Sequence, residues 1–329
     1  MLNLTSIFGS LQWTGSVALG LCYVAAVLGV YLTFRVLNFP DLTIEGSFPL
    51  GAGLAGILIA AGWPHWATLP IAIAGGALAG AATGMLATRL KINGLLASIL
   101  VMIALYSINL RVLGLRSNLP LLGVETIVDP VRAWLAPLFG AQAPGGVVQR
   151  YAAILVFGLI AVGLIGGLNW LLHTELGLAL RAAGDNEQMA SAQGISTPQM
   201  QILGLAISNG LIALSGALFA PYQGFADVTI GRGLIVVGLA SVIIGEVLFN
   251  PRRLLTALIA AAVGSLVYRL FVTLALTYTG RIGLQETDLQ FVTALIVIAA
   301  MAVPRFRRGA VGQRRVTLPS RVREEKIKG

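Results

Sequence analysis

Nine runs of mainly apolar residues, each close to the length of a membrane-crossing helix, make up most of this sequence. A helix that crosses the hydrocarbon core of a bilayer needs roughly 20 such residues. The runs cover residues 12–34, 46–62, 68–88, 93–113, 151–172, 199–220, 233–249, 254–278 and 288–304. They predict an all-α polytopic membrane protein with about nine or ten transmembrane helices.

The alternative of ten helices arises because several runs are short or rich in glycine. A broken or re-entrant segment would fit best in the stretch LNFPDLTIEGSFPLGAGLAG, residues 37–56. With a cytoplasmic C-terminus, nine crossings put the N-terminus outside, whereas a further crossing before residue 68 would put it in the cytoplasm.

The composition excludes a soluble domain. Charged residues make up only 11% of the chain and hydrophobic residues 57%, with a mean hydropathy of +0.87, whereas about a quarter of the residues of a soluble domain are charged. The single cysteine, Cys22, lies in the first apolar run and rules out an intramolecular disulfide framework.

The net charge of +9 does not indicate nucleic-acid binding, because nine of the 22 Lys and Arg residues follow residue 304. A basic tail beside a membrane span sets topology and contacts anionic lipid headgroups. We therefore divide the chain into a transmembrane domain, residues 1–304, and a basic cytoplasmic tail, residues 305–329.

The distribution of positive residues predicts the orientation. If the tail is cytoplasmic and there are nine crossings, the inner segments hold fifteen Lys and Arg: Arg35, Arg89, Lys91, Arg181, Arg252, Arg253 and the nine of the tail. The outer segments hold six: Arg111, Arg116, Arg132, Arg150, Arg232 and Arg281. This asymmetry favours the proposed orientation. The absence of Lys and Arg before Arg35 also argues against a cleaved signal peptide.

A polar stretch, TELGLALRAAGDNEQMASAQGIST, residues 174–197, separates the fifth and sixth runs on the predicted cytoplasmic side. Residues 175–183 are helix formers, and Gly184 suits a left-handed position after a helix. Asp185 is placed to cap a second helix, with Gln188 as its capping-box partner.

This second helix is predicted over residues 186–193 and ends at Gly194. Thr197 and Pro198 then supply a cap and a first-turn proline for the next span. Small residues at 190–192 permit close approach by another surface. The residues alone favour a docking helix and an ordinary ordered loop about equally.

The stretch ELGLALRAAGDNEQMASAQGIS resembles the cytoplasmic signature of permease subunits in ATP-binding-cassette (ABC) importers of the branched-chain amino-acid and ribose type. The matching positions are Gly177, Arg181, Ala182, Gly184, Asn186, Ala190, Gly194 and Ile195. Residues 233–249 and 92–111 resemble two further segments of that family, and most of residues 15–303 fit it.

The resemblance implies a type II-like ABC importer permease fold in the bacterial inner membrane, with coupling loop 173–198 seated in a cleft of a separate ATPase subunit. It assigns ATPase coupling to Gly177, Arg181, Ala182, Gly184, Asp185, Asn186, Ala190 and Gly194. The implied partners are ABC ATPase subunits, an extracytoplasmic substrate-binding protein and a second copy of the chain in a homodimer, although related systems also pair two different permeases. ATP and Mg²⁺ would bind to the ATPase, so no cofactor is expected in this chain.

The stretch FPDLTIEGSFPLGA, residues 39–52, resembles the branch of this family that works with tryptophan- or tyrosine-type binding proteins. The branched-chain branch usually shows a different glycine-containing stretch after its asparagine-phenylalanine pair, whereas Asn38-Phe39 is followed here by Pro40-Asp41. An aromatic amino acid is the expected substrate, with branched-chain amino acids, sugars and nucleosides as alternatives.

Three carboxylates are candidates for the inner vestibule: Asp41, Glu45 and Glu246. Asp41 and Glu45 are four residues apart and would share one face of a helix near the inner boundary, where hydration is the alternative to a functional role. Glu246 lies three residues from the end of its run, where it would either reach the interface or pack against the helix dipole or Arg252.

Four residues are candidates for the translocation path: Asn109, Asn209, Gly238 and Arg269. A mid-span charge such as that of Arg269 costs roughly 2.5–3.5 kcal/mol and needs a partner or a water-filled cavity. Asn109, with Tyr106 and Ser107, and Asn209 either form interhelical hydrogen bonds or line the path.

Glycine is abundant, with 40 in 329 residues. In AGGALAGAATG, residues 74–84, small residues four apart predict close helix packing. Around Gly231, Gly233 and Gly238 the glycines are instead expected to break a helix near a cavity.

Catalytic and metal sites are not indicated. The sequence contains no G-x-x-x-x-G-K-[ST] motif, so any ATPase must be another chain, and His65 and His173 are isolated on opposite sides of the membrane. The loop at 114–150, predicted outside, would either pack against a binding protein or remain an untethered surface loop. The rival classes are an ion-gradient-driven secondary transporter and an intramembrane enzyme.

Overall fold

The computed structural model describes residues 10–139 and 145–282, which are almost entirely helical. The first half contains α2 (Ser10–Tyr31) with its π-helical extension η1 (Leu32–Val36), α3 (Ile44–Ala60), α4 (His65–Thr88), α5 (Gly94–Val112), β1 (Asn118–Pro120) and α6 (Asp129–Phe139). The second half contains α7 (Gly145–His173), α8 (Glu175–Asp185), α9 (Glu187–Ala192), α10 (Thr197–Gln223), β2 (Phe225–Asp227), α11 (Leu234–Phe249) and α12 (Leu254–Ile282).

Eight helices coincide with predicted runs. Six are long and apolar enough to cross a membrane, within Trp13–Val36, His65–Thr88, Gly94–Val112, Gly146–His173, Thr197–Gln223 and Leu254–Ala275. The helices at the second and seventh runs, α3 and α11, have only 17 and 16 residues. The ninth run, 288–304, lies outside the described residues. The chain is thus a multi-pass helical membrane protein.

The segment between α2 and α4 contains a single helix, so the described residues do not support a tenth crossing there. After η1, Asn38 adopts a left-handed φ of 52°, a conformation that asparagine tolerates better than most residues. The chain then turns back into the bundle, and Asp41 contacts Asn209 about midway along α10. For this reason α3 begins inside the bundle and is short.

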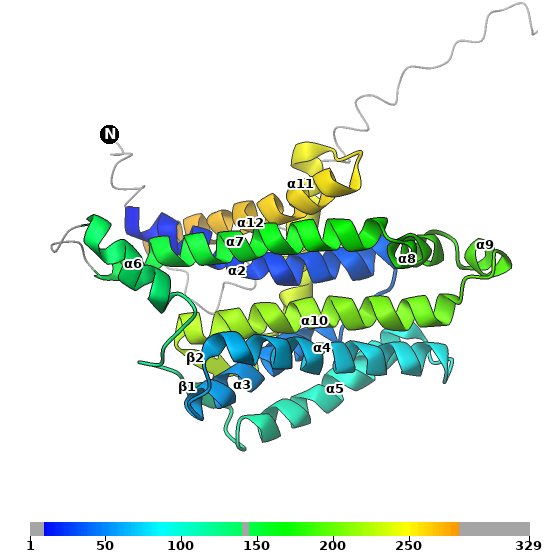
Figure 1. Cartoon of the computed structure of the whole chain (residues 1–329), viewed down its shortest axis with the longest axis horizontal. Coiled ribbons are helices and arrows are strands. Elements are labelled where there is room, and N and C mark those ends of the chain that lie inside the picture. Colours follow the sequence, from blue (N-terminus) through cyan, green and yellow to red (C-terminus); the bar gives the residue numbers. More distant parts are fainter. Residues whose placement is uncertain (1–9, 140–144, 283–329) are drawn as a thin grey trace, which may run out of the picture.

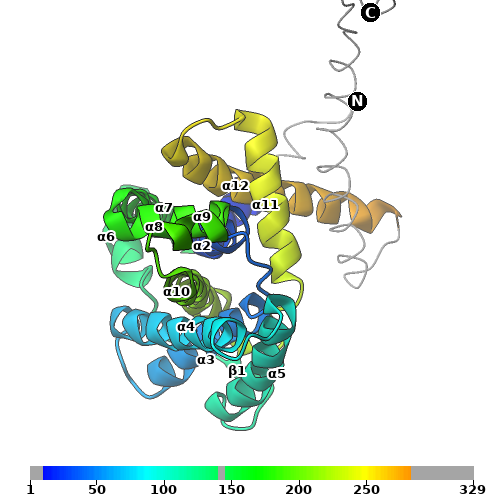
Figure 2. The ribbon, with the colours of Figure 1, turned by 90° about the vertical axis from the view of Figure 1, so that its right-hand side faces the viewer.

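Helix α10 lies at the centre and packs against α2, α3 and α4. In Figure 1, α2, α7 and α12 lie on one side of α10 and α3, α4 and α5 on the other. Helices α8 and α9 lie at one end of the bundle, and β1, β2 and α6 at the opposite end (Figure 1). Figure 2 shows α11 running along one flank, steeply inclined to the bundle axis, before the chain enters α12.

The contact between α4 and α10 depends on the glycines predicted to pack closely. A Cβ at Gly76 would lie 2.3 Å from the carbonyl oxygen of Asn209, and one at Gly80 would lie 2.1 Å from that of Leu205. A Cβ at Gly84 would lie 2.7 Å from the Cα of Ile202. The spacing of four therefore places one glycine stripe against the backbone of α10, which confirms the packing prediction.

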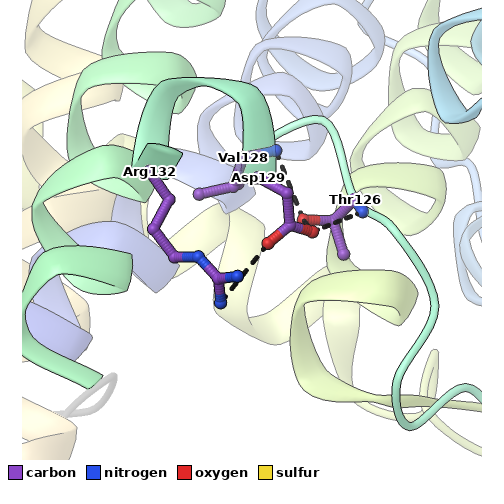
Figure 3. Close-up of polar contacts among 4 residues, drawn as sticks. All are labelled: Thr126, Val128, Asp129 and Arg132. Atoms are coloured by element: carbon purple, nitrogen blue, oxygen red, sulfur yellow. Dashed lines mark hydrogen bonds and ion pairs between the residues drawn. The ribbon is translucent and has the colours of Figure 1, made fainter. Parts of the chain in front are cut away.

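The predicted outer loop is held to the bundle, so the untethered alternative is wrong for its described part. β1 pairs antiparallel with β2, and the backbone N–H of Ile127 donates to Nδ1 of His65 at 3.0 Å. Figure 3 shows the start of α6, where the Asp129 carboxylate accepts from the Thr126 N–H at 2.7 Å and lies 3.5 Å from Arg132. These contacts fix one surface at the end of the bundle opposite α8 and α9.

Candidate functional site: the coupling loop and a cavity on the bundle flank

The polar stretch forms two short helices with side-chain caps. Thr174 Oγ1 accepts from the Gly177 N–H at 3.3 Å at the start of α8, and Asn186 Oδ1 accepts from the Met189 N–H at 2.9 Å at the start of α9. The predicted Asp185–Gln188 capping box is wrong, because α8 extends through Asp185 and the next residue is the cap. Asparagine serves equally well in this position.

Gly184 also has a different role from the one predicted. It lies inside α8 rather than after it, and it is not among the residues with positive φ. A Cβ there would lie 1.9 Å from the carbonyl oxygen of Val36, so the glycine allows α8 to contact the end of η1. A π-helical segment within an α-helix often marks a functional position, and here it is the contact point of the coupling loop.

The rest of the loop is closely packed on its inner side. Ala190 is buried. Helix α9 ends at Ala192, two residues before the predicted stop at Gly194, which has a φ of 85°. Pro198 lies in the first turn of α10 as predicted, but Ser196 occupies the cap position, and the Thr197 hydroxyl donates to Glu187 at 3.3 Å. Helix α9 therefore presents exposed Met189 outward and is anchored to the first turn of α10 behind it.

A cavity of about 740 Å³ lies between α8, η1 and the start of α12. We call it the arginine cavity; its lining includes Arg35, Arg181, Ala182, Asp185, Arg252 and Arg253. All four arginines were predicted to lie on the same side of the membrane. The structure brings them to the same end of the bundle, although their spans are far apart in sequence.

Glu246 forms an ion pair with Arg35, and both side chains are partly exposed. Of the alternatives left open for Glu246, pairing with Arg252 is not observed, because the partner is Arg35. The pair joins the end of η1 to the last turn of α11 at the end of the bundle that carries α8. Through Gly184, η1 and this ion pair, the coupling loop is in contact with α11.

Asp41 is fully buried, so the hydrated-boundary alternative is wrong for this residue. It precedes α3 rather than sharing a helix face with Glu45. One carboxylate oxygen accepts from Asn209 Nδ2 at 2.7 Å and the other from the Thr43 N–H at 2.9 Å. Asn209 Oδ1 in turn accepts from the Ser47 hydroxyl at 2.7 Å. Asn209 is fully buried in this network, so we assign it to packing rather than to a path wall.

Replacing Asp41 by asparagine is expected to lower the stability of the folded chain. Two N–H donors point at the carboxylate, and an amide has only one oxygen, so either orientation leaves one donor facing another donor. The cost of one such unpaired buried group is about 1–3 kcal/mol. We expect Asp41→Asn to lower the melting temperature of the detergent-purified chain.

The control for this prediction is Asp185→Asn, at an exposed carboxylate of α8. It should melt like the unsubstituted chain. Equal melting of the two variants would show that the buried network contributes little to stability.

A second cavity, of about 640 Å³, lies on the flank between α3, α5 and the turn before α11. We call it the flank cavity, and six of its lining residues are Glu45, Met102, Tyr106, Ser107, Asn109 and Arg232. The part of α5 that lines it is the half nearer β1, so the cavity lies toward the end of the bundle opposite α8 and α9. Glu45 is thus not in an inner vestibule, as predicted, but in the wall of this cavity.

Glu45 and Asn109 are each held by a backbone contact. Glu45 Oε1 accepts from the Gly233 N–H at 3.0 Å, at the start of α11. Asn109 Nδ2 donates to the Gly46 carbonyl at 3.0 Å, while its buried Oδ1 has no hydrogen-bond partner among the described residues. Asn109 therefore combines the two roles that the sequence left open, an interhelical bond and a cavity wall.

The two remaining path candidates have packing partners. The Arg269 guanidinium lies 5.6 Å from the centre of the Tyr23 ring, an attractive cation–π geometry. A Cβ at Gly238 would lie 2.6 Å from Val30. The predicted helix break is not observed at these glycines: Gly233, with a φ of 76°, caps the start of α11, and Gly238 lies within that helix.

Sequence reasoning missed Arg232 as a site residue. It was counted only as an outer positive charge, whereas the turn after β2 carries it back toward α3. Thr43 and Thr83 were also missed; their hydroxyls lie 2.6 Å apart beside Asp41. An isolated hydroxyl in an apolar run does not indicate a site. A charged residue between two glycines, as in Gly231-Arg232-Gly233, could have been recognised as a candidate site residue.

Residues 14–300 match the protein family described as the permease component of the branched-chain amino acid transport system. The chain is 40% identical over 276 residues to a tyrosine transport system permease protein of Clostridioides difficile, covering 84% of this chain and 85% of that protein. It is 28% identical over 255 residues to an autoinducer 2 import system permease protein of Salmonella paratyphi B, covering 74% and 63% of the two chains.

Among solved structures, the chain is similar to a metal-chelate type ABC transporter in an inward-facing conformation. The identity is 18% and the TM-score 0.45, with 92% of this chain and 89% of that chain covered.

Proposed function

We propose a function from the premise that this chain belongs to the family of permease components of branched-chain amino acid transport systems. The chain is the membrane subunit of an ABC importer and forms the translocation path for an amino acid, with an aromatic amino acid as the expected substrate. The similarity to a tyrosine transport system permease over most of both chains is the observation that carries this proposal. The similarity to an import system permease supports the inward direction.

The family implies an ATPase and a substrate-binding protein as partners, and the two ends of the bundle suggest where each of them docks. ABC ATPase subunits dock on α9 and the exposed side of α8, and bind ATP and Mg²⁺, so this subunit is itself non-catalytic. A substrate-binding protein docks on the opposite end, where β1, β2 and α6 are held to the bundle. Two copies of the chain form a homodimer with the path between them, in the bacterial inner membrane and surrounded by lipid.

The contacts of α8 suggest how ATPase closure reaches the membrane. A movement of α8 is passed to η1, because the backbones of Gly184 and Val36 touch. It is passed on to α11 through the ion pair of Arg35 and Glu246. Since Gly233 at the other end of α11 is bonded to Glu45, the same movement reaches the wall of the flank cavity.

The test begins with purification of the full chain from its own membranes in mild detergent, with identification of the proteins that accompany it. We expect a stoichiometric ATPase. Reconstituted with that ATPase and the recovered binding protein, the complex should take up tyrosine only when ATP is present on the ATPase side.

Two results would contradict the proposal. If the chain emerges alone under conditions that preserve other transporter complexes, or if uptake follows an ion gradient without ATP, the secondary transporter becomes the better assignment. ATP-driven uptake of a branched-chain amino acid, sugar or nucleoside but not of tyrosine would keep the importer and change the substrate.

A further inference from the structure

The flank cavity contains one negative and one positive group that do not pair with each other. Glu45, at the start of α3, and Arg232, in the turn before α11, both line it. Within the described residues, no ion pair joins the two, and the Arg232 guanidinium has no other charged partner. Opposite charges on a cavity wall that remain apart leave room for a ligand that carries both.

The backbone holds these two groups in place. One Glu45 oxygen accepts from Gly233 N–H, which leaves the second oxygen without a hydrogen-bond partner among the described residues. A Cβ at Gly231 would lie 2.0 Å from the Glu45 carbonyl oxygen, so the turn that carries Arg232 packs directly on the start of α3. The carboxylate and the base of the arginine side chain are therefore positioned without a ligand.

Asn109 provides an independent observation. It is 1% exposed, its Nδ2 donates to the Gly46 carbonyl, and no donor in the part of the chain that the structure describes reaches its Oδ1. A buried acceptor without a donor is costly, and native structures usually satisfy it. An ammonium group has three donors, enough to serve Glu45 and Asn109 together.

The rest of the wall suits an aromatic side chain. Tyr106 is 51% exposed and Ile103 59% exposed, and Met102, next to Ile103 in α5, also lines the cavity. A tyrosine ring packs well in offset or edge-on contact with another ring, and methionine adds favourable sulfur–aromatic contact. The volume of about 640 Å³ is within the range of small-molecule sites.

We propose that the flank cavity is a recognition subsite of the permease itself for a zwitterionic aromatic α-amino acid, with the ammonium at Glu45 and Asn109 and the carboxylate at Arg232. The inference rests on the proposed function, from which it takes the amino-acid substrate. The inference adds that the membrane subunit itself recognises both the α-ammonium and the α-carboxylate group of the substrate.

The test uses a thiol probe in the cavity wall. Ser107 is exposed and lines the cavity, while the native Cys22 is the only cysteine and is buried. The full-length Ser107→Cys chain in lipid nanodiscs is treated with a polar methanethiosulfonate reagent, and the rate of modification is measured. We expect L-tyrosine and L-phenylalanine to slow the reaction, and tyramine and 3-(4-hydroxyphenyl)propionate, which each lack one charge, to leave it unchanged.

Two further substitutions test the two charges, and a third is their control. Glu45→Gln keeps an oxygen that accepts from Gly233 N–H but removes the charge, and Arg232→Gln removes the guanidinium. Each should raise the tyrosine concentration needed for half-protection about tenfold, as expected for loss of a charge-assisted contact. Arg116→Gln, at an exposed arginine of the same end that does not line the cavity, should change nothing.

Outcomes of this experiment are independent of ATP and of the other subunits. Absence of protection by saturating tyrosine, equal protection by the single-charge analogues, or full protection in Glu45→Gln and Arg232→Gln would each overturn the subsite. If Ser107→Cys fails to fold, Ile103→Cys provides the same probe on the adjacent turn. ATP-driven tyrosine uptake without protection would retain the importer and reject the subsite, whereas protection without ATP-driven uptake would reject the importer.

Discussion

Replacing Gly80 by valine is expected to prevent stable folding of the chain. A Cβ at this position would lie 2.1 Å from the Leu205 carbonyl oxygen and 2.9 Å from the Asn209 Cβ. The obstructing oxygen belongs to the backbone of the central helix and cannot rotate away, so α4 and α10 must separate. Overpacking costs about 1–3 kcal/mol even where side chains can rearrange, and displacement of Asn209 would also break its bonds to Asp41.

The measurement for Gly80→Val is the yield of monodisperse protein on size-exclusion chromatography, followed by its melting temperature. Gly163→Val is the matched control, since Gly163 lies in another apolar helix, α7, and a Cβ there meets no atom of the described residues within 4 Å. Equal yield and melting of both variants would contradict the close contact of α4 and α10.

Replacing Gly184 by valine is expected to uncouple ATP hydrolysis from uptake while the bundle remains folded. A Cβ there would lie 1.9 Å from the Val36 carbonyl oxygen and 2.9 Å from the Leu37 Cα, so α8 must move away from η1. Helix α9 and its Asn186 cap are not touched, and the ATPase should still co-purify. We expect ATP-driven uptake to fall at least about tenfold, equivalent to roughly 1.4 kcal/mol of lost coupling.

Two further variants separate coupling from docking and from general damage. Asn186→Leu removes the side-chain acceptor that caps α9, and should instead reduce co-purification of the ATPase. Gly166→Val places the same bulk on α7, where a Cβ has no neighbour among the described residues within 4 Å, and should leave uptake intact. Normal uptake by Gly184→Val would show that the contact of α8 with η1 does not transmit the movement.

Local sequence patterns predicted the positions of the two helices of the coupling loop, but not the residue that caps the second helix or the role of Gly184. The run of helix formers at 175–183 and the glycine at 194 placed α8 and, to within two residues, the end of α9. The cap was assigned to Asp185 instead of Asn186, because both residues cap helices well and the sequence alone does not choose between neighbours. The role of Gly184 was wrong because its neighbour, Val36, is distant in sequence.

The partners of the three carboxylates, Asp41, Glu45 and Glu246, could likewise not be predicted from neighbouring residues. Asp41 and Glu45 have the spacing of one helix face, but Asn38 turns the chain and α3 starts only at Ile44. One carboxylate therefore enters a buried network and the other lines a cavity. For Glu246 the sequence offered Arg252, three residues beyond the end of its own helix, as one possible partner, and the structure instead pairs it with Arg35 of a distant segment.

The sequence by itself determined that the chain is a helical membrane protein, where most of its helices lie, which loops share a side and which family the coupling stretch resembles. These properties depend on runs of neighbouring residues and on the cost of placing polar groups in lipid. The tertiary structure alone decided which residues come together: Arg232 and Glu45 in the wall of one cavity, Asn209 on Asp41, and Gly184 on Val36. Such contacts join residues of distant segments, and their geometry depends on how tightly the glycine-rich helices pack and on where the chain turns back into the bundle.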